Sequence, residues 1–460
     1  MKLQTISDDK INKLDRGFLI AEMMISFSIM TLLLTSIFTL SSSIKSLKEL
    51  ANRKLENIEY ASSILSNISS LFTPSTSTAF STTLYGNDTK AFYVEPLKKL
   101  ISDYENAWGR EDCNSRFFIS DSSFNSENIN ENIILYEQGI DTTLGTGISN
   151  PSTDIEVRNK IGYLVTDSAS ASLADFFIID MENPASPYIL STLNTGPGLS
   201  SIEVAGPFAF VANMGTTNQL QIIDIRDRET PILLSKLKLP PPQASSTLPF
   251  ATSIFYSHGL IYLGTEKWKG MEFSIIDVHN PNSPQYLGGF ETNTLVKDIY
   301  IRNNRAYIAT SDEEQIKVLN VSTPENIIKI DSQILSGWET QTSQTFSYFE
   351  EEMALGRTTG GINNKNNYEF FLFSSTSPFL ISNSKDVVGG VYGILLRRPY
   401  VYIATRNPGS EFQIWNLNTD LKDPVYTKSL SFLPNAMTCD KRDLYFSTGN
   451  NKGIAVIKLI

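Results

Sequence analysis

Residues that bind metals or carry acid–base chemistry are scarce in this sequence. It holds two cysteines and two histidines among 460 residues. Two cysteines exclude a cysteine zinc cluster and a disulfide-dense scaffold, and two histidines leave little for a histidine metal centre. We therefore expect no metal, no cofactor, no catalytic residue and no enzymatic activity.

Positive charge is also in short supply. Lys and Arg number 38 against 49 Asp and Glu, which gives a net charge of −11, and charged residues make up only 19% of the chain. A nucleic-acid-binding domain is expected to present a basic face. We therefore expect no nucleic-acid partner, and the length indicates more than one domain.

One long stretch near the N-terminus lacks charge entirely. It runs from Met23 to Leu40, and the apolar segment begins at Phe18. About 23 residues at about 1.5 Å rise would span a bilayer as a helix. Glu22 is the one carboxylate within that segment. A charge placed there is costly and usually has a functional partner.

The residues that open this segment carry a family resemblance. The order Arg16, Gly17, Phe18 and Glu22, followed by the apolar run, resembles the processing site of type IV pilins and pseudopilins. The resemblance implies that a prepilin peptidase cuts after Gly17 and that the new amino terminus at Phe18 is methylated. It also implies that Glu22 neutralises the Phe18 amine of a neighbouring subunit during assembly. The alternative is a plain signal anchor with Glu22 near the membrane surface.

The apolar pattern continues beyond the membrane segment with helical spacing. From Ile44 to Phe72 apolar residues recur three and four positions apart, and neither proline nor glycine interrupts 18–72. This predicts one long pilin-like helix. Pro74 ends it, and a Ser/Thr-rich stretch follows. We expect a leader at 1–17, the helix at 18–72 and a linker with a small connecting region at 73–130.

The remainder of the chain repeats. A strand motif recurs seven times at intervals of roughly 45 residues, at Tyr163, Phe210, Tyr262, Tyr307, Ala354, Tyr402 and Tyr445. Each copy is followed by a second apolar strand, and most of these end in Asp or Asn before a turn. Four strands in such a unit form a β-propeller blade. We predict a mainly β fold, a seven-bladed propeller of four-stranded antiparallel blades over 131–460, carried on the long helix.

The last repeat is incomplete, because the sequence reaches Ile460 in its third strand. The segment Asn132–Glu137 has a strand pattern, and we expect it to supply the missing outer strand and close the ring. The motif Ile-Ile-Asp followed by an Asn-Pro turn resembles the LVIVD-type repeats of bacterial surface propellers. That resemblance covers about 154–460.

Several features could be interpreted as chemistry, and we weigh each against a plain structural role. His258 and His279 fall in predicted turns, which favours surface residues over a catalytic base. A ring of strand-end carboxylates could bind a cation, but Asp at a strand end commonly caps the next turn. The acidic tip 311–314 lacks the spacing of a calcium loop, and 358–361 lacks the lysine of a phosphate loop. The carboxylates in question are Asp180, Asp224 and Asp277.

Cys113 and Cys439 raise one more question. In an exported protein two cysteines are often paired. Cys113 precedes the proposed closing strand and Cys439 lies in the last repeat, so both approach the same part of the ring. A disulfide between them remains open against two unpaired thiols.

Together these features predict a type IV pilin-like filament subunit, minor or tip-located, whose propeller head serves adhesion or partner binding. Its expected partners are the prepilin peptidase, other pilin subunits with their assembly platform, the membrane, and a surface protein or glycan. We expect it in the cytoplasmic membrane, leader inside, before assembly and at the cell surface afterwards. The alternatives are a pseudopilin of a type II-like secretion or DNA-uptake system, and a membrane-tethered propeller enzyme.

Overall fold

The computed structural model describes the propeller part of the chain. The described residues are 133–136, 151–167, 173–242, 247–335, 342–349, 352–358, 368–372, 380–385, 387, 389–397, 399–417, 423–440, 443–449 and 453–459. The expected leader, the helix at 18–72 and the connecting region lie outside them. So do Gly17, Phe18, Glu22 and Cys113.

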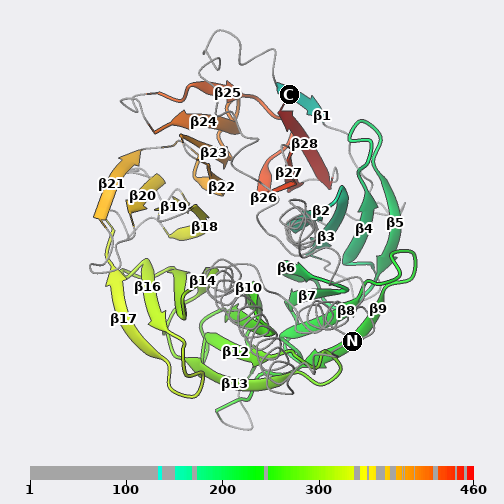
Figure 1. The fold of residues 1–460 in the computed structure, drawn as a ribbon, viewed down its shortest axis with the longest axis vertical. Coiled ribbons are helices and arrows are strands. Elements are labelled where there is room, and N and C mark those ends of the chain that lie inside the picture. Colours follow the sequence, from blue (N-terminus) through cyan, green and yellow to red (C-terminus); the bar gives the residue numbers. More distant parts are fainter. Residues whose placement is uncertain are drawn as a thin grey trace, which may run out of the picture. The chain divides into compact units, whose positions relative to one another are not determined.

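The described strands form seven four-stranded antiparallel sheets arranged as a ring, in which one edge strand of each sheet lies nearest the centre (Figure 1). Six of these sheets, blades 1 to 6, are each built from four strands consecutive in sequence. The remaining one, the composite sheet, has the order β1-β28-β27-β26 and joins the two ends of the described chain.

The strand bounds follow the predicted repeat. Blade 1 contains β2 (Ser152–Arg158), β3 (Ile161–Thr166), β4 (Phe176–Asp180) and β5 (Tyr188–Leu193). Blade 2 contains β6 (Leu199–Ala205), β7 (Phe208–Asn213), β8 (Leu220–Asp224) and β9 (Ile232–Leu237). Blade 3 contains β10 (Ala251–Ser257), β11 (Leu260–Thr265), β12 (Phe273–Asp277) and β13 (Gln285–Phe290).

The second half of the ring has the same plan. Blade 4 contains β14 (Val296–Arg302), β15 (Arg305–Thr310), β16 (Ile316–Asn320) and β17 (Ile328–Gln333). Blade 5 contains β18 (Ser343–Phe349), β19 (Glu352–Arg357), β20 (Tyr368–Leu372) and β21 (Leu380–Lys385). Blade 6 contains β22 (Val391–Arg397), β23 (Tyr400–Thr405), β24 (Phe412–Asn416) and β25 (Tyr426–Lys428). The composite sheet contains β26 (Pro434–Asp440), β27 (Asp443–Thr448), β28 (Ile454–Leu459) and β1 (Ile133–Tyr136).

The expected fold class therefore needs correction. The prediction was a seven-bladed propeller carried on one long helix, but the described residues contain strands and connections and no helix. Six blades are continuous in sequence, and the seventh sheet is assembled from both ends of the described chain. No helix within the described ranges is long and apolar enough to cross a membrane. The correction arises because the helical pattern and the strand repeat occupy different parts of the sequence, and only the strand repeat falls on described residues.

Burial explains the residue pattern of the strands. The second strand of each blade is packed between neighbouring sheets, so β3 and β23 are buried along their whole length. Such strands appear in the sequence as continuous apolar runs. Aromatic rings fill the space between sheets, as where Phe210 of blade 2 stacks on Tyr256 of blade 3 at 5.0 Å between centroids. The strand repeat thus follows from packing on both faces.

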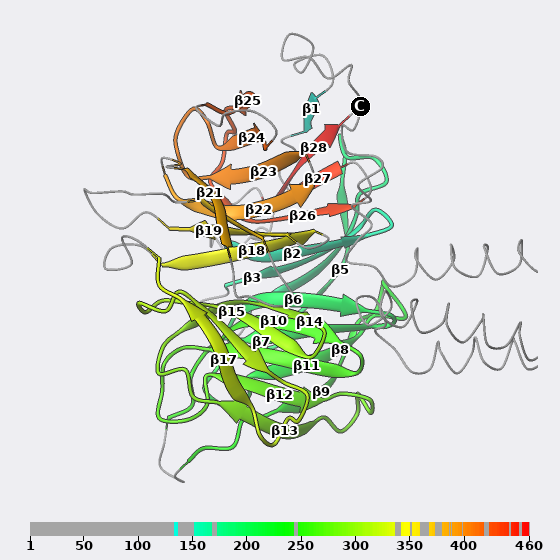
Figure 2. The same ribbon diagram turned by 60° about the vertical axis from the view of Figure 1, so that its left-hand side comes forward.

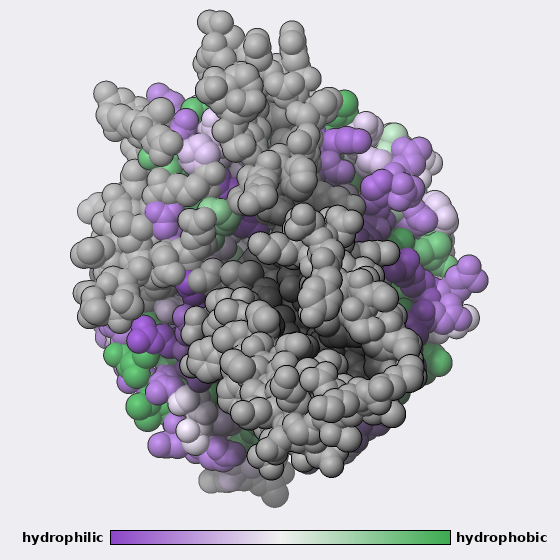
Figure 3. Space-filling view, in the orientation of Figure 1, coloured by the Kyte–Doolittle hydropathy of each residue, from purple (hydrophilic) through white to green (hydrophobic). Residues whose placement is uncertain are grey.

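Outer strands are half exposed, because only one of their edges is paired. Figure 2 brings the outer strand β17 of blade 4 forward, and its Ile328 is 49% exposed. Other exposed large apolar side chains in the described ranges include Tyr188 on β5 and Ile232 on β9, which belong to other blades. On the face shown in Figure 3 apolar residues are likewise scattered. Ile330 on β17 and Ile334 just after it are exposed as well, whereas the other exposed apolar residues stand singly, which is ordinary.

The ring is closed where the sequence predicts. β1 pairs antiparallel with β28, from Ile133 opposite Leu459 to Tyr136 opposite Val456. Leu135 packs against the apolar cluster between blade 6 and the composite sheet. On the other side, Ser152 Oγ donates to the Gly453 carbonyl at 2.9 Å, joining blade 1 to the composite sheet.

Candidate functional site at the inner ring

The inner strands share one irregularity. Each of the seven pairs between a first and a second strand has a register shift after its first residue, for example between Val296 and Asp298. A β-bulge inserts one extra residue, bends the strand and redirects a side chain. We call the seven inserted residues the bulge ring; they are Thr153, Ser200, Thr252, Lys297, Gln344, Tyr392 and Asn435. All seven are partly exposed.

Part of the bulge ring ties neighbouring sheets together. Thr153 Oγ1 donates to the Leu199 carbonyl at 2.6 Å, and Ser200 Oγ donates to the Ala251 carbonyl at 2.7 Å. Thr252 Oγ1 donates to the Val296 carbonyl at 2.6 Å in the same way. In each case the acceptor is the first residue of the next inner strand. These three hydroxyls are therefore committed to holding blades 1 to 4 together.

Two further junctions use different donors for the same purpose. Asn435 Nδ2 donates to the Ser152 carbonyl at 2.6 Å and so joins the composite sheet to blade 1. Between blade 6 and the composite sheet, Arg406 Nε donates to the Pro434 carbonyl at 3.3 Å. The Arg406 guanidinium also hydrogen bonds Asn435 and lies over the ring of Tyr392, 3.8 Å from its centroid. Arg406 thus takes the place of the bulge hydroxyl there.

The other two junctions lack this bond. Lys297 of blade 4 and Gln344 of blade 5 form no hydrogen bond or ion pair with any residue that the structure describes. They are consecutive in the ring, so the two junctions without a hydrogen bond from the bulge residue, 4–5 and 5–6, are neighbours. Burial lowers the pKa of Lys297, while the charge of Glu266 raises it in part. The half-buried ammonium therefore interacts with the charge of Glu266 but forms no direct ion pair in the described part of the chain.

Hydrogen bonds from backbone N–H groups to side-chain oxygens hold these two junctions further along the strands. Asp298 Oδ2 accepts from the Phe346 N–H at 2.7 Å, and Ser347 Oγ accepts from the Leu396 N–H at 2.8 Å. Junction 1–2 has a similar clamp, in which Asp154 Oδ2 accepts from Ser201 Oγ at 2.8 Å and from the Ile202 N–H at 3.0 Å. Lys297 and Gln344 are therefore not needed to join their sheets.

Two carboxylates, the half-buried Asp154 and the fully buried Asp175, predict a pH-dependent stability. Burial raises the pKa of both Asp154 and Asp175 to about 6, although hydrogen bonds lower it in part. Because the folded state holds these protons more tightly than the unfolded state does, stability is greatest below about pH 4 and falls as pH rises through about 6. We expect a loss on the order of 1–2 kcal/mol per group between pH 5 and pH 7.5, after allowance for solvent screening.

Chemical denaturation of the wild type and Asp154→Asn at both pH values measures this loss. The variant is expected to be less stable throughout, because its amide cannot accept from Ser201 and Ile202 in the same way. The diagnostic quantity is the difference in the free energy of unfolding between pH 5 and pH 7.5. This difference is expected to be smaller in the variant than in the wild type. An unchanged difference would show that Asp154 does not titrate in this range.

The strand-end carboxylates have the structural role that the sequence favours. Asp180 Oδ1 accepts from the Glu182 N–H at 2.9 Å, and Asp277 Oδ1 accepts from the His279 N–H at 2.8 Å. Asp224 caps the N–H of Arg226 at 3.0 Å and forms an ion pair with its guanidinium. These side chains cap turns in three different blades. Within the described ranges no three His, Cys, Asp or Glu residues gather as a metal site.

The two histidines lie in neighbouring turns of blade 3. His258 Nδ1 is 2.6 Å from Ser257 Oγ, and His279 Nδ1 is 2.7 Å from Asp277 Oδ1. A catalytic triad needs one histidine that contacts both the nucleophile and the carboxylate. Here the hydroxyl and the carboxylate contact different histidines, so the geometry favours two turn residues.

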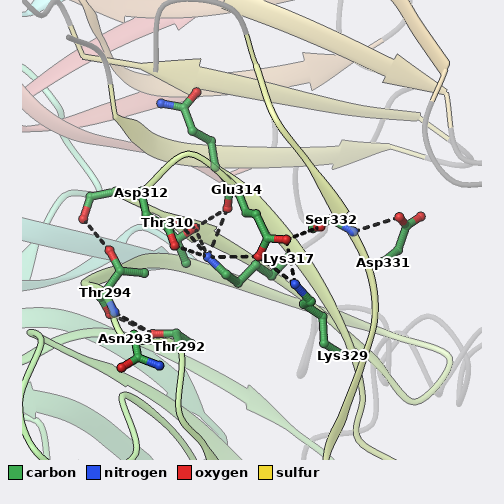
Figure 4. A network of polar contacts seen from close by, with 12 residues as sticks. Thr292, Asn293, Thr294, Thr310, Asp312, Glu314, Lys317, Lys329, Asp331 and Ser332 are labelled. Carbon is green, nitrogen blue, oxygen red and sulfur yellow. Dashed lines mark hydrogen bonds and ion pairs between the residues drawn. The ribbon is translucent and has the colours of Figure 1, made fainter. Parts of the chain in front are cut away.

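The acidic tip of blade 4 proves to be neutralised from within (Figure 4). Both Asp312 oxygens accept from the buried Lys317 Nζ at 2.7 Å. Glu314 pairs with Lys329 at 2.6 Å and accepts from Ser332 Oγ at 2.8 Å. The carboxylates of Asp312 and Glu314 therefore serve two lysines of their own blade.

Cys439 is buried in the inner strand β26 and is disulfide-bonded. The sequence contains one other cysteine, Cys113, which lies outside the described residues.

The bulge ring is a feature that sequence reasoning missed. Its members differ in chemical type, so residue identity gives no signal. Their position does: each stands ten residues before the repeated aromatic or its replacement, as Thr153 before Tyr163 and Lys297 before Tyr307. The repeat therefore fixes the position of each member, but it does not show that a bulge forms there.

Comparisons with known proteins agree with this architecture. Residues 199–238 match the family model of the LVIVD repeat and coincide with blade 2. The chain is similar to the solved structure of Raptor from Chaetomium thermophilum, with 9% identity and a TM-score of 0.52 over 72% of this chain and 29% of that one. No curated protein matches the chain. The chain therefore contains an LVIVD repeat within a β-propeller.

Two further solved structures are similar with lower scores. One is the β-propeller domain of Cps50 (Swd1) from Myceliophteria thermophila, at 11% identity and a TM-score of 0.49, covering 67% of this chain and 96% of that one. The other is the computationally designed Ika8 protein, at 9% identity and a TM-score of 0.46, covering 70% and 98%. Likeness at such identity concerns fold and carries no function.

Proposed function

We propose that this chain is a type IV pilin-like filament subunit, minor or tip-located, that displays its propeller for adhesion or partner binding at the cell surface. The observation that carries the proposal is the order of Gly17, Phe18 and Glu22 at the start of the uncharged segment. In this proposal the prepilin peptidase cuts after Gly17 and Phe18 becomes the methylated amino terminus. Glu22 then pairs with the Phe18 amine of another subunit.

The propeller supports a binding role better than a catalytic one. Each histidine contacts its own turn, and the strand-end carboxylates cap turns in separate blades. The inner ring instead presents side chains of mixed chemistry on a rigid frame, which suits recognition. Before assembly the subunit sits in the cytoplasmic membrane with its leader inside. After assembly it lies at the cell surface, with other pilin subunits and the assembly platform as its partners.

Processing provides the test of this proposal. In cells that contain a prepilin peptidase, the mature chain is expected to begin at a methylated Phe18, because the glycine before the cut fits the peptidase only without a side chain. Gly17→Ile is expected to abolish cleavage and leave a heavier, full-length form. Intact mass and N-terminal sequencing of membrane-extracted protein distinguish the two forms.

A second variant separates processing from assembly. Glu22→Ala removes a charge from an apolar segment, so insertion and cleavage should continue. Incorporation into sheared surface filaments should fall at least tenfold, because the Phe18 amine loses its partner. A wild-type chain that retains residues 1–17 would overturn the proposal, and normal incorporation of Glu22→Ala would remove the assembly role of Glu22.

A further inference from the structure

The seven junctions of the bulge ring are not equivalent, and the two that differ from the rest are adjacent. Five of the seven junctions are bonded through Thr153, Ser200, Thr252, Arg406 and Asn435. The two junctions without such a bond at the bulge are adjacent and carry Lys297 and Gln344, the residues in the bulge positions of blades 4 and 5. At junction 4–5 a different hydroxyl acts as donor, because Ser343 Oγ donates to the Gln315 carbonyl at 2.8 Å.

The two side chains are not required for structure. Asp298 and Ser347 already bond the next inner strand at the same two junctions. Lys297 is half-buried and forms no ion pair within the described ranges, and the charge of Glu266 offsets the cost of burying its ammonium only in part. An anionic group from outside the chain would offset that cost.

The next bulge residue, Tyr392, indicates what kind of molecule carries the anionic group. Tyr392, next in the ring after Gln344, is partly exposed and is held by the guanidinium of Arg406. Lys297, Gln344 and Tyr392 together offer a cation, an amide and an aromatic ring on three consecutive blades. A carboxylate can pair with the Lys297 ammonium, and hydroxyl groups can hydrogen bond the Gln344 amide. The apolar face of a sugar ring can pack against the Tyr392 ring.

A peptide fits this place less well. An extended peptide can bind an exposed sheet edge by pairing its backbone with the edge strand. At these junctions the inner-edge N–H groups of Phe346 and Leu396 are already bonded. Recognition here is left to side chains, which favours a small carboxylated unit over an extended backbone.

We propose that Lys297, Gln344 and Tyr392 form a binding site for a carboxylated sugar on the inner ring of blades 4 to 6. The inference rests on the binding role of the head proposed above and names its ligand class. The Lys297 ammonium binds the carboxylate, Gln344 bonds sugar hydroxyls, and Tyr392, kept in place by Arg406, packs against the sugar ring.

Isothermal titration of the full chain in detergent tests the site, with trigalacturonate as the probe. Saturable one-to-one binding is expected, and the fully methyl-esterified trimer should bind at least tenfold more weakly because its carboxylates are neutral. Lys297→Gln should lose at least tenfold in affinity. The matched control is Lys236→Gln, which removes the same charge from the exposed outer strand β9 and should bind like the wild type.

Additional arms identify the source and guard against misfolding. Galacturonate alone competes if one sugar unit fills the site, whereas a trimer-only response indicates a chain; either result supports the proposal. If Lys297→Gln lowers the unfolding temperature, Gln344→Glu, which adds a repelling charge at the next junction, replaces it and should also lose at least tenfold. Three results would overturn the proposal: equal affinity of the wild type and these variants, tighter binding of poly-glutamate or inorganic phosphate, or no binding of trigalacturonate. None of these results depends on processing at Gly17, so failure here leaves the filament proposal standing.

Discussion

A propeller that lacks β1 is expected to lose its monomeric folded state. We compare a head beginning at Glu131 with one beginning at Pro151. The shorter form loses the four residue pairs between β1 and β28 and the packing of Leu135 and Tyr136. The lost apolar burial costs roughly 3 kcal/mol, and the newly exposed edge of β28 invites association between molecules. Size-exclusion chromatography and denaturant titration measure both effects.

Two single substitutions in the longer head refine this test. Leu135→Ser removes a side chain that packs against the cluster of blade 6 and the composite sheet, so it should lower the free energy of unfolding by about 2 kcal/mol. Ile134→Ser is the matched control, because Ile134 is 38% exposed and should change stability little. If the two heads prove equally stable and equally monomeric, β1 does not close the ring in solution.

Removal of the Asp312 carboxylate should destabilise blade 4 strongly. The side chain of Lys317 is only 4% exposed, and both Asp312 oxygens accept from its ammonium at 2.7 Å. Two neutral oxygens, Thr310 Oγ1 and the Glu314 carbonyl, accept from it at 3.3 Å. Asp312→Ala leaves a buried charge without its main partner, a change that typically costs about 3 kcal/mol or more. The Glu314 carboxylate, whose Oε2 is 3.8 Å from Lys317 Nζ, compensates only in part. Denaturant titration of the head measures the loss.

A double-mutant cycle identifies the cause. Lys317→Met in the Asp312→Ala background removes the stranded charge and should restore at least half of the lost stability. Glu313→Ala changes the same charge at the adjacent, exposed position and should have almost no effect. Equal losses for Asp312→Ala and Glu313→Ala would mean that the ion pair contributes nothing particular.

The parts of the fold that depend on packing could be predicted from the sequence. The repeated aromatics at Tyr163, Tyr262 and Tyr402 mark second strands. A strand buried on both faces appears in the sequence as an apolar run, and this run recurs once in each blade. The closing strand could be recognised because an incomplete last repeat must take its edge from elsewhere. The turn-capping role of Asp180 and Asp277 followed from their position at strand ends.

The inner ring could not be predicted in this way. A bulge is a backbone irregularity, and a hydroxyl, an amide or an ammonium can all occupy it, as Thr252, Asn435 and Lys297 show. Likewise the sequence shows acidic residues at 311–314 but not the ammonium of Lys317 beneath them, since that contact depends on how the loop folds back over β16. Side-chain partners across a turn or a junction require coordinates.

The composite sheet also decides how the propeller carries mechanical load. Any tension on the chain before residue 133 enters the ring at β1, whose grip on β28 is four residue pairs long. The continuous blades receive that tension only after β1 has yielded. Cys439 lies in β26, the inner strand of the same sheet. A covalent link from Cys439 to the chain before β1 would transfer the pull directly to the centre of the ring and leave its weakest strand unloaded.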